Sequence, residues 1–183
     1  MTTIRVWGNH HCKDDNKFEE TFKDLTRNQD SSEEPIVYAK NIQCLSDRFI
    51  KNIRKTIKIT GNNPQIHVIV VGSIDFHKGV TQERLVKQMT QIAKLAQIQT
   101  KVHIIISAII PKGIPEENLS KITCIELNEE ISSEIRRLPR VTIVRVDHYL
   151  HATDYVEPFV LNQNGGTKLA QLLAASVFNV MRC

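Results

Sequence analysis

The stretch that decides the fold is Gln65-Ile66-His67-Val68-Ile69-Val70-Val71-Gly72-Ser73-Ile74-Asp75-Phe76. Val68 to Val71 is a run of β-branched residues without polar alternation. A strand with one solvated face would alternate, so this run predicts a strand covered on both faces, as in a parallel sheet between helix layers. The polar residues from Gly72 to Asp75 would then lie at the carboxyl edge of the sheet, where open α/β sheets place their sites. We therefore expect part of any functional site there.

Length and composition favour one α/β domain spanning residues 1–183. The chain has 183 residues, enough for a substantial core, with 41% hydrophobic and only 5% aromatic residues. No apolar run approaches the roughly 20 residues that span a bilayer. The amino terminus is short and polar before Ile4, unlike a signal peptide. We expect no membrane partner and a cytoplasmic location.

Cysteine spacing indicates the redox compartment, and net charge indicates which partners are compatible with the chain. The four cysteines show no CxxC spacing, which favours a reduced intracellular compartment. The net charge of +4 arises from 24 basic and 20 acidic residues. This balance permits a polyanionic partner without requiring one, so the placement of the charges must decide.

Strand and helix patterns alternate along the chain. Strands are expected at 4–7, 36–39, 68–71, 102–106 and 141–146, and helices at 18–25, 47–59, 81–96, 119–138 and 167–181. A polar loop at 27–35 and a long loop at 147–164 interrupt them, and Gly165-Gly166 leads into the last helix. The alternation predicts a three-layer α/β/α sandwich with a five-stranded parallel sheet, in which 68–71 and 104–106 are inner strands.

Three short blocks carry a family resemblance. They are Val6-Trp7-Gly8-Asn9-His10, Val71-Gly72-Ser73-Ile74-Asp75, and Glu157-Pro158-Phe159-Val160-Leu161-Asn162 with Gly165 and Leu169-Ala170. Their order resembles the SGNH, or GDSL-type, hydrolases, a three-layer α/β/α family of esterases and lipases. That family places Gly-Asp-Ser after the first strand, Gly-x-Asn-Asp after the third, and Asp-x-x-His-Leu-Asn before the last helix. The resemblance covers nearly the whole chain, and the tail of the third block is its most specific part.

At the positions that correspond to the family's catalytic residues, this chain has residues that cannot perform the family's chemistry. His10 stands at the nucleophilic serine position, Ile74 at the oxyanion-hole asparagine, Glu157 at the triad aspartate and Val160 at the triad histidine. Isoleucine cannot donate to an oxyanion, a contribution of about 3 to 4 kcal/mol, and valine cannot take a proton. We therefore expect no hydrolysis by the family mechanism, no catalytic residue and no cofactor.

This chain combines an SGNH framework that lacks the catalytic residues with a net positive charge and no signal peptide. In these features it resembles the carboxy-terminal OSK domain of Oskar, the insect germ-plasm protein. The resemblance implies a non-enzymatic module that binds RNA, single-stranded messenger RNA in particular, in cytoplasmic ribonucleoprotein granules. Other granule proteins would be further partners. A retrotransposon-encoded SGNH domain would share the framework, but we would expect it to retain its serine and histidine.

The helix expected at 47–59 carries the residue-level argument for nucleic acid. At about 100° per residue, Arg48, Lys51, Lys55 and Lys58 fall within an arc of roughly 80°, with Arg54 at its border. The apolar residues fill the opposite side, and no acidic residue follows Asp47 to balance the charges. A merely solvated face is the alternative to phosphate binding. Lys168 and Arg182 are further surface candidates, and Tyr149 and Tyr155 are the stacking candidates.

Other functions remain open from sequence. A relocated esterase site would use Ser73 with His10 or His77 as base, and a protein-interaction scaffold would need neither turnover nor RNA. His10-His11-Cys12 with His148 and His151 could suggest zinc, but no pair has a tight ligand spacing, so we expect no metal. We expect His10 to fill the vacated serine pocket.

Overall fold

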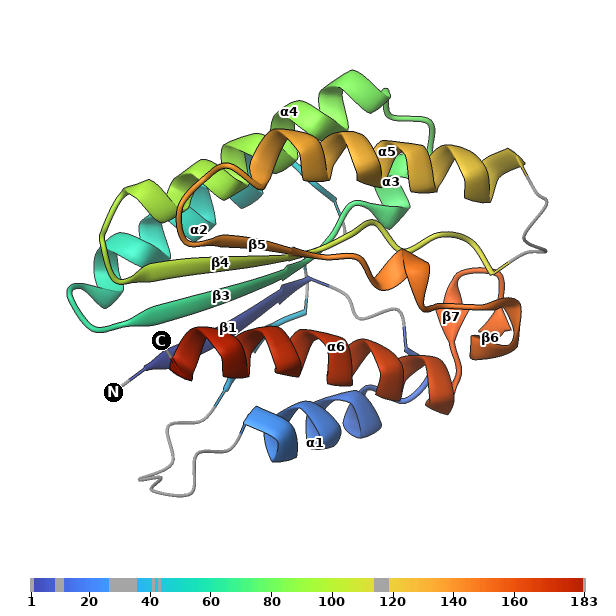
Figure 1. Cartoon of the computed structure of the whole chain (residues 1–183), viewed down its shortest axis with the longest axis horizontal. Coiled ribbons are helices and arrows are strands. Elements are labelled where there is room, and N and C mark those ends of the chain that lie inside the picture. Colours follow the sequence, from blue (N-terminus) through green and yellow to red (C-terminus); the bar gives the residue numbers. More distant parts are fainter. Residues whose placement is uncertain are drawn as a thin grey trace.

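The computed structural model of the chain describes residues 2–8, 12–26, 36–40, 42, 44–113 and 119–182. Within them, five parallel strands form one sheet in the order β2-β1-β3-β4-β5 (Figure 1). The strands are β1 (Thr3–Gly8), β2 (Val37–Ala39), β3 (Gln65–Val70), β4 (Val102–Ser107) and β5 (Val141–Val144). The expected five-stranded parallel sheet is confirmed, as are the inner positions of the strands at 68–71 and 104–106.

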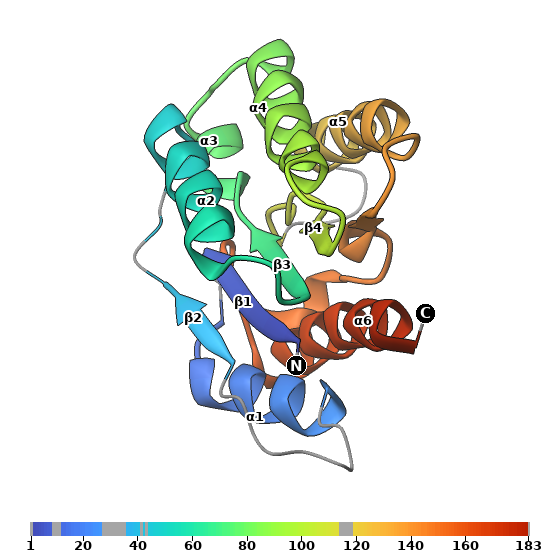
Figure 2. The same cartoon turned by 90° about the vertical axis from the view of Figure 1, so that its left-hand side faces the viewer.

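Helices cover both faces of this sheet. They are α1 (Asp15–Thr26), α2 (Asp47–Thr60), α3 (Ser73–His77), α4 (Gln82–Lys94), α5 (Leu119–Ile135) and α6 (Gln163–Arg182). Figure 2 shows α2, α3, α4 and α5 on one face and α1 and α6 on the other. This is the expected three-layer α/β/α sandwich.

The central strand shows why the run of β-branched residues predicted the fold. Along β3, Val68 packs in the core beneath α1 and α6, whereas Ile69 packs in the core beneath α2, α4 and α5. Both residues are 0% exposed. A strand buried on both faces has no position for a polar alternation, so its sequence is continuously apolar.

The last helix begins earlier than expected, at Gln163 rather than Thr167. Asn162 Oδ1 accepts a hydrogen bond from Gly165 N at 3.0 Å, which caps the first turn. A Cβ atom on Gly165 would lie 2.3 Å from the carbonyl oxygen of Asp154. The glycine therefore serves a close approach inside the helix, rather than marking the loop before it.

The segment predicted as a long loop at 147–164 is also more ordered than expected. It contains short 3₁₀ turns and a separate antiparallel pair, β6 (Tyr155–Glu157) and β7 (Val160–Leu161). Tyr155 Oη donates to the carbonyl oxygen of Pro111 at 2.6 Å, and Gly113 N donates to that of Pro158 at 2.7 Å. These bonds hold the hairpin against the chain that follows β4, at the carboxyl edge of the sheet.

Smaller differences concern element ends. The fifth strand ends at Val144 and the preceding helix at Ile135, both short of the expected limits. The predicted loop at 27–35 lies outside the described residues. None of the helices in the described part of the chain combines the length and apolar character that crossing a lipid bilayer needs.

Candidate functional site

The carboxyl edge of the sheet contains the turn from β3 into α3. Gly72 has a φ of 104°, a backbone conformation that glycine adopts without strain, and α3 begins at the next residue. Ser73, 5% exposed, donates from Oγ to the carbonyl oxygen of Ile110 at 2.8 Å and accepts from Ile110 N at 3.0 Å. Its hydroxyl therefore joins α3 to the segment after β4, and it donates its proton in a hydrogen bond to a backbone carbonyl oxygen rather than to a histidine.

His77 lies one turn after Ser73 and has different neighbours. Its ring centroid is 4.7 Å from that of Phe159, and Lys112 Nζ lies 5.3 Å from the Phe159 ring. Partial burial and the nearby Lys112 charge lower the pKa of His77. The neutral imidazole thus packs against an aromatic ring, and its described contacts do not include the Ser73 hydroxyl.

The degenerate positions of the family pattern fall on α3 and the hairpin. Ile74 is half-buried in α3, Val160 is half-buried in β7, and Glu157 is exposed in β6. His10 lies outside the described residues. Of the other three, Ile74 and Val160 have hydrocarbon side chains, so neither can donate to an oxyanion or accept a proton.

The start of α2 is fixed by hydrogen bonds to this edge. Ser46 Oγ caps the helix by accepting from Phe49 N at 3.2 Å. The buried Asp75 accepts from Leu45 N through Oδ2 at 2.9 Å, and Gln88 Nε2 donates to the Leu45 carbonyl oxygen at 3.3 Å. Helices α3 and α4 therefore both position the amino-terminal end of α2.

A second set of bonds fixes the other end of α2. Gln65 Nε2 donates to the carbonyl oxygens of Ile57 and Gly61 at 3.1 and 3.2 Å. Gln65 Oε1 lies 2.9 Å from His67 Nε2, and His67 Nδ1 accepts from Trp7 Nε1 at 3.0 Å. Burial and the Arg5 charge lower the pKa of His67 to about 4, so the imidazole is neutral and donates from Nε2. The helix is thereby tied to β3 and β1.

Between these ends, α2 separates apolar from basic side chains. Its apolar residues are buried: Phe49, Ile50, Ile53 and Ile57. Its five cationic residues are all exposed: Arg48, Lys51, Arg54, Lys55 and Lys58. Among the described residues, none of the five forms an ion pair with a carboxylate. We call these five residues the α2 basic face; the carboxylates in the described part of the chain do not neutralise its charge.

The two candidates on α6 lie elsewhere. Lys168 Nζ pairs with Asp154 Oδ2 at 2.8 Å, and Asp154 is only 3% exposed. Arg182 lies with its guanidinium 4.9 Å from the Phe178 ring. Since α6 covers the opposite face of the sheet from α2 (Figures 1 and 2), the structure does not join these residues to the α2 basic face.

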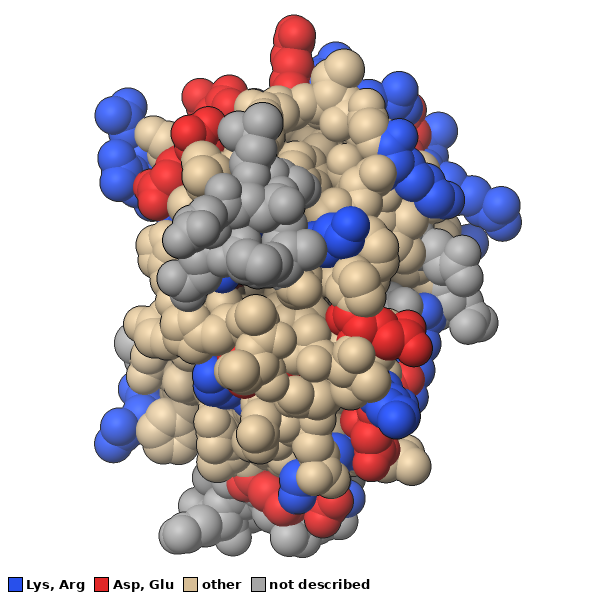
Figure 3. Space-filling model, turned by 90° about the vertical axis from the view of Figure 1, so that its right-hand side faces the viewer, with Lys and Arg blue, Asp and Glu red and all other residues tan. Residues whose placement is uncertain are grey.

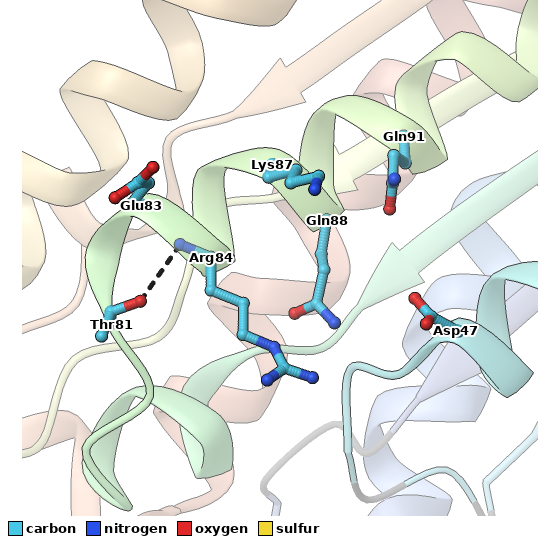
Figure 4. A pocket seen from close by; sticks show the side chains of 7 residues that line it. All are labelled: Asp47, Thr81, Glu83, Arg84, Lys87, Gln88 and Gln91. Carbon is cyan, nitrogen blue, oxygen red and sulfur yellow. Dashed lines mark hydrogen bonds between the residues drawn. The ribbon is translucent and has the colours of Figure 1, made fainter.

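Sequence reasoning missed the basic residues of α4. Arg84 and Lys87 are exposed on this helix and line a hollow between α2 and α4 (Figure 4). The apolar periodicity of the segment 81–96 indicates only the inward side of this helix. The signal that could have found them is its polar side, where Arg84, Lys87, Gln88 and Gln91 recur at helical spacing.

The distribution of charge across the carboxyl edge agrees with this arrangement. In Figure 3 the centre of the face is largely uncharged, and lysine and arginine side chains gather at its upper right, on the side where α2 lies. Of the stacking candidates, Tyr149 is 56% exposed, whereas Tyr155 is partly buried and bonded to Pro111. The open basic surface is thus beside the carboxyl edge rather than in its centre.

The zinc hypothesis concerns residues that are only partly described. His10 and His11 lie outside the described residues, and His148 Nε2 lies 3.6 Å from Glu129. In the part of the chain that is described, no three His, Cys, Asp or Glu side chains form a group that could hold a metal.

Comparison with solved structures identifies the fold. A member of the lipolytic G-D-S-L family from Veillonella parvula aligns with 98% of this chain and 99% of its own, at 15% identity and a TM-score of 0.71. A GDSL-like lipase from Bacteroides thetaiotaomicron aligns over 97% and 87%, at 14% identity and a TM-score of 0.68. A carbohydrate esterase family 3 protein from Talaromyces cellulolyticus aligns over 100% and 99%, at 12% identity and a TM-score of 0.72. The chain therefore has the fold of the SGNH/GDSL hydrolases.

Sequence comparison adds nothing further. No protein-family model matches the chain, and no curated protein matches it. At these identities the structural likeness shows the fold alone, so the function has to be argued from the residues of this chain.

Proposed function

We propose that this chain is a non-catalytic RNA-binding module with an SGNH-like fold, which binds single-stranded RNA through the α2 basic face. The supporting observation is the set of five exposed cations on one helix without a carboxylate partner among the described residues. On an exposed helix face, acidic residues at i,i+4 spacing would stabilise such cations, and like charges at that spacing destabilise the helix. A polyanion such as RNA would supply the missing negative charge.

The rigidity of α2 supports the same proposal. Its apolar side is buried and both of its ends are hydrogen-bonded to other elements, so the backbone that carries the cations is held in place. A preorganised surface loses less conformational freedom on binding than a mobile one. From Arg48 to Lys58 the helix rises ~15 Å, enough to follow several phosphates of an extended strand.

The α2 basic face has charges but no pattern for reading bases. Lysine and arginine side chains on a helix surface contact phosphates, and these contacts fix position without specifying sequence. RNA sequence preference would have to come from the neighbouring hollow or from loops. We propose messenger RNA as the natural partner and cytoplasmic ribonucleoprotein granules as the location, on the resemblance to the OSK domain of Oskar.

We also propose that the chain does not hydrolyse esters. Ile74 and Val160 lack the groups that the family mechanism needs, and the Ser73 hydroxyl is bonded to Ile110. A nucleophilic serine would need a base within hydrogen-bond reach of its hydroxyl. The neighbours in fold are described as lipases and esterases, so turnover is the first activity to be measured on this chain.

The test is direct binding of labelled single-stranded RNA, by ultraviolet crosslinking and by fluorescence anisotropy over a range of salt concentrations. If three to five phosphates are contacted, the slope of log affinity against log salt concentration should be about −2 to −3.5, from ~0.7 per contact. No crosslink and no anisotropy change at low salt would contradict the proposal.

One observation favours a second candidate, a protein-interaction scaffold. The β6–β7 hairpin exposes apolar side chains at the carboxyl edge, with Val156 46% and Phe159 45% exposed. An apolar contact there would survive high salt, whereas phosphate binding on α2 would not. A partner that stays bound at 1 M salt and is lost in Phe159→Ala would favour the scaffold.

A further inference from the structure

The hollow between α2 and α4 has the size of a small-molecule site, and its lining side chains are all polar or charged. Its volume is about 410 Å³, within the roughly 300 to 1,000 Å³ of known ligand pockets. Asp47 lines it from the first turn of α2 (Figure 4). The remaining lining residues come from α4 and its cap: Thr81, Glu83, Arg84, Lys87, Gln88 and Gln91.

The two walls of this hollow differ in charge. Arg84 and Lys87 stand three residues apart on α4, and neither forms an ion pair with a described carboxylate. Asp47 lies on the opposite wall, whereas Glu83 points away from the gap in Figure 4. An anionic group would therefore settle on the α4 wall, and the α2 wall would accept hydrogen bonds.

The deepest polar group is the amide of Gln88, which is 4% exposed. Its Nε2 donates to the Leu45 carbonyl oxygen, which fixes the orientation of the side chain. Its Oε1 is buried and has no hydrogen-bond donor among the described residues. Buried carbonyl oxygens normally accept a hydrogen bond. A ligand in the hollow could therefore donate a hydrogen bond to Gln88 Oε1.

We propose that this hollow holds one nucleotide of the bound RNA, with its phosphate on Arg84 and Lys87 and a donor group on Gln88 Oε1. The donor is either an exocyclic amino group of the base or the ribose 2′-hydroxyl. This inference rests on the proposed function and adds a reading pocket to it. Lys51 follows Asp47 by one helical turn, so a strand that tracks the α2 basic face reaches the hollow at its end.

The experiment compares three fluorescein-labelled 12-mers, oligo(rA), oligo(rU) and oligo(dA), on the wild type and three variants. Arg84→Ala removes a phosphate contact, and Gln88→Met removes the acceptor at similar volume. Lys94→Ala is the matched control, because Lys94 is exposed on the same helix but does not line the hollow. Thermal unfolding establishes that each variant is folded.

We expect Arg84→Ala to weaken binding of all three 12-mers and to reduce the salt slope by ~0.7, with Lys94→Ala close to wild type. We expect the wild type to bind two of the three oligonucleotides roughly fivefold or more tightly than the third and Gln88→Met to abolish that difference. A preference for oligo(rA) and oligo(dA) over oligo(rU) assigns the donor to the base, and one for oligo(rA) and oligo(rU) over oligo(dA) assigns it to the 2′-hydroxyl.

Equal wild-type affinity for all three oligonucleotides, or a preference that survives in Gln88→Met, would overturn the pocket. Should Gln88→Met fail to fold, Arg84→Ala decides alone, since its exposed side chain is not needed for folding. Tight RNA binding unaffected by Arg84→Ala would remove the pocket and leave the α2 basic face standing. The absence of any RNA binding by the wild type would remove both.

Discussion

Ser73 and Ile110 exchange two hydrogen bonds, one from Ser73 Oγ to the Ile110 carbonyl oxygen at 2.8 Å and one from Ile110 N to Ser73 Oγ at 3.0 Å. The pair joins the ends of two neighbouring strands, because Ser73 follows β3 and Ile110 follows β4. The one serine that a relocated nucleophile would use is thus a buried structural link. Replacing Ser73 by alanine distinguishes a structural role, which would lower stability, from a catalytic role, which would abolish turnover.

Ser73→Ala should lower the free energy of unfolding by about 1 to 3 kcal/mol, because it leaves the buried backbone groups of Ile110 without a partner. Urea unfolding followed by the fluorescence of Trp7, the one tryptophan in the chain, measures this change. Ser133→Ala is the matched control, since Ser133 is exposed on α5. Equal stability of the two variants would contradict the structural role.

Hydrolysis of p-nitrophenyl acetate should stay at the buffer rate for the wild type, because Val160 and Ile74, at the histidine and asparagine positions of the family mechanism, can supply neither a base nor an oxyanion donor. Spectrophotometric assays of the wild type, His10→Ala and Ser73→Ala test this. Turnover that survives His10→Ala and is lost in folded Ser73→Ala would establish the relocated esterase instead.

The stability of the protein should fall as the pH drops from about 6.5 toward 4, because of His67. Its folded-state pKa of about 4 lies below the ordinary value of 6.5, so the unfolded chain takes up a proton in this window before the folded one does. The stabilisation is complete above pH 6.5, and roughly 3 kcal/mol of it is lost by pH 4, at 1.36 kcal/mol per pKa unit.

Urea titrations at half-unit pH steps measure this dependence, again through Trp7, which donates directly to His67. In His67→Gln the slope between pH 6.5 and 4 should become shallower, because an amide can accept and donate without titrating. His77 and His103, whose pKa values are also lowered, should retain part of the slope. An unchanged slope in His67→Gln would place the effect elsewhere.

Lys168 should act in folding rather than in RNA binding. Burial alone would raise the pKa of Asp154, but the Lys168 and His151 hydrogen bonds outweigh it and lower the pKa. Removal of Lys168 would leave this buried carboxylate unpaired, at a cost of about 1 to 2 kcal/mol given the partial exposure of the lysine. Lys168→Ala should therefore lower the melting temperature at pH 7 and leave RNA affinity unchanged, and a reduced salt slope would contradict this.

The sequence was sufficient for the sheet and for the two sides of α2, because both follow from periodicity. The run of β-branched residues that begins at Val68 predicts a strand buried on both faces, and β3 is buried along its length to Val70. The charges and isoleucines of α2 separate at helical spacing. The start of α6 could not be read, because Gly165 belongs to a close contact with Asp154 that no local pattern shows.

The pairing of residues across elements was equally invisible in sequence. Lys168 has the sequence signature of a surface lysine, and its partner Asp154 lies in a stretch predicted as loop. The hollow that Arg84 and Lys87 line depends on the sheet order, which places α2 and α4 on the same face. The sequence therefore predicts the α2 basic face but not the basic residues Arg84 and Lys87 on the neighbouring helix α4.

The most direct test is the RNA affinity of the charge-reversal variant Lys51→Glu with Lys55→Glu. We expect a loss of at least tenfold at ~0.1 M salt and a shallower salt slope, with an unchanged melting temperature, because both side chains lie opposite the buried side of α2. The matched control is Lys13→Glu with Lys23→Glu, which makes the same change in net charge at exposed positions on the α1 side of the sheet. Affinity lost in the first variant and retained in the second supports the account; equal affinity of both, or equal losses, contradicts it.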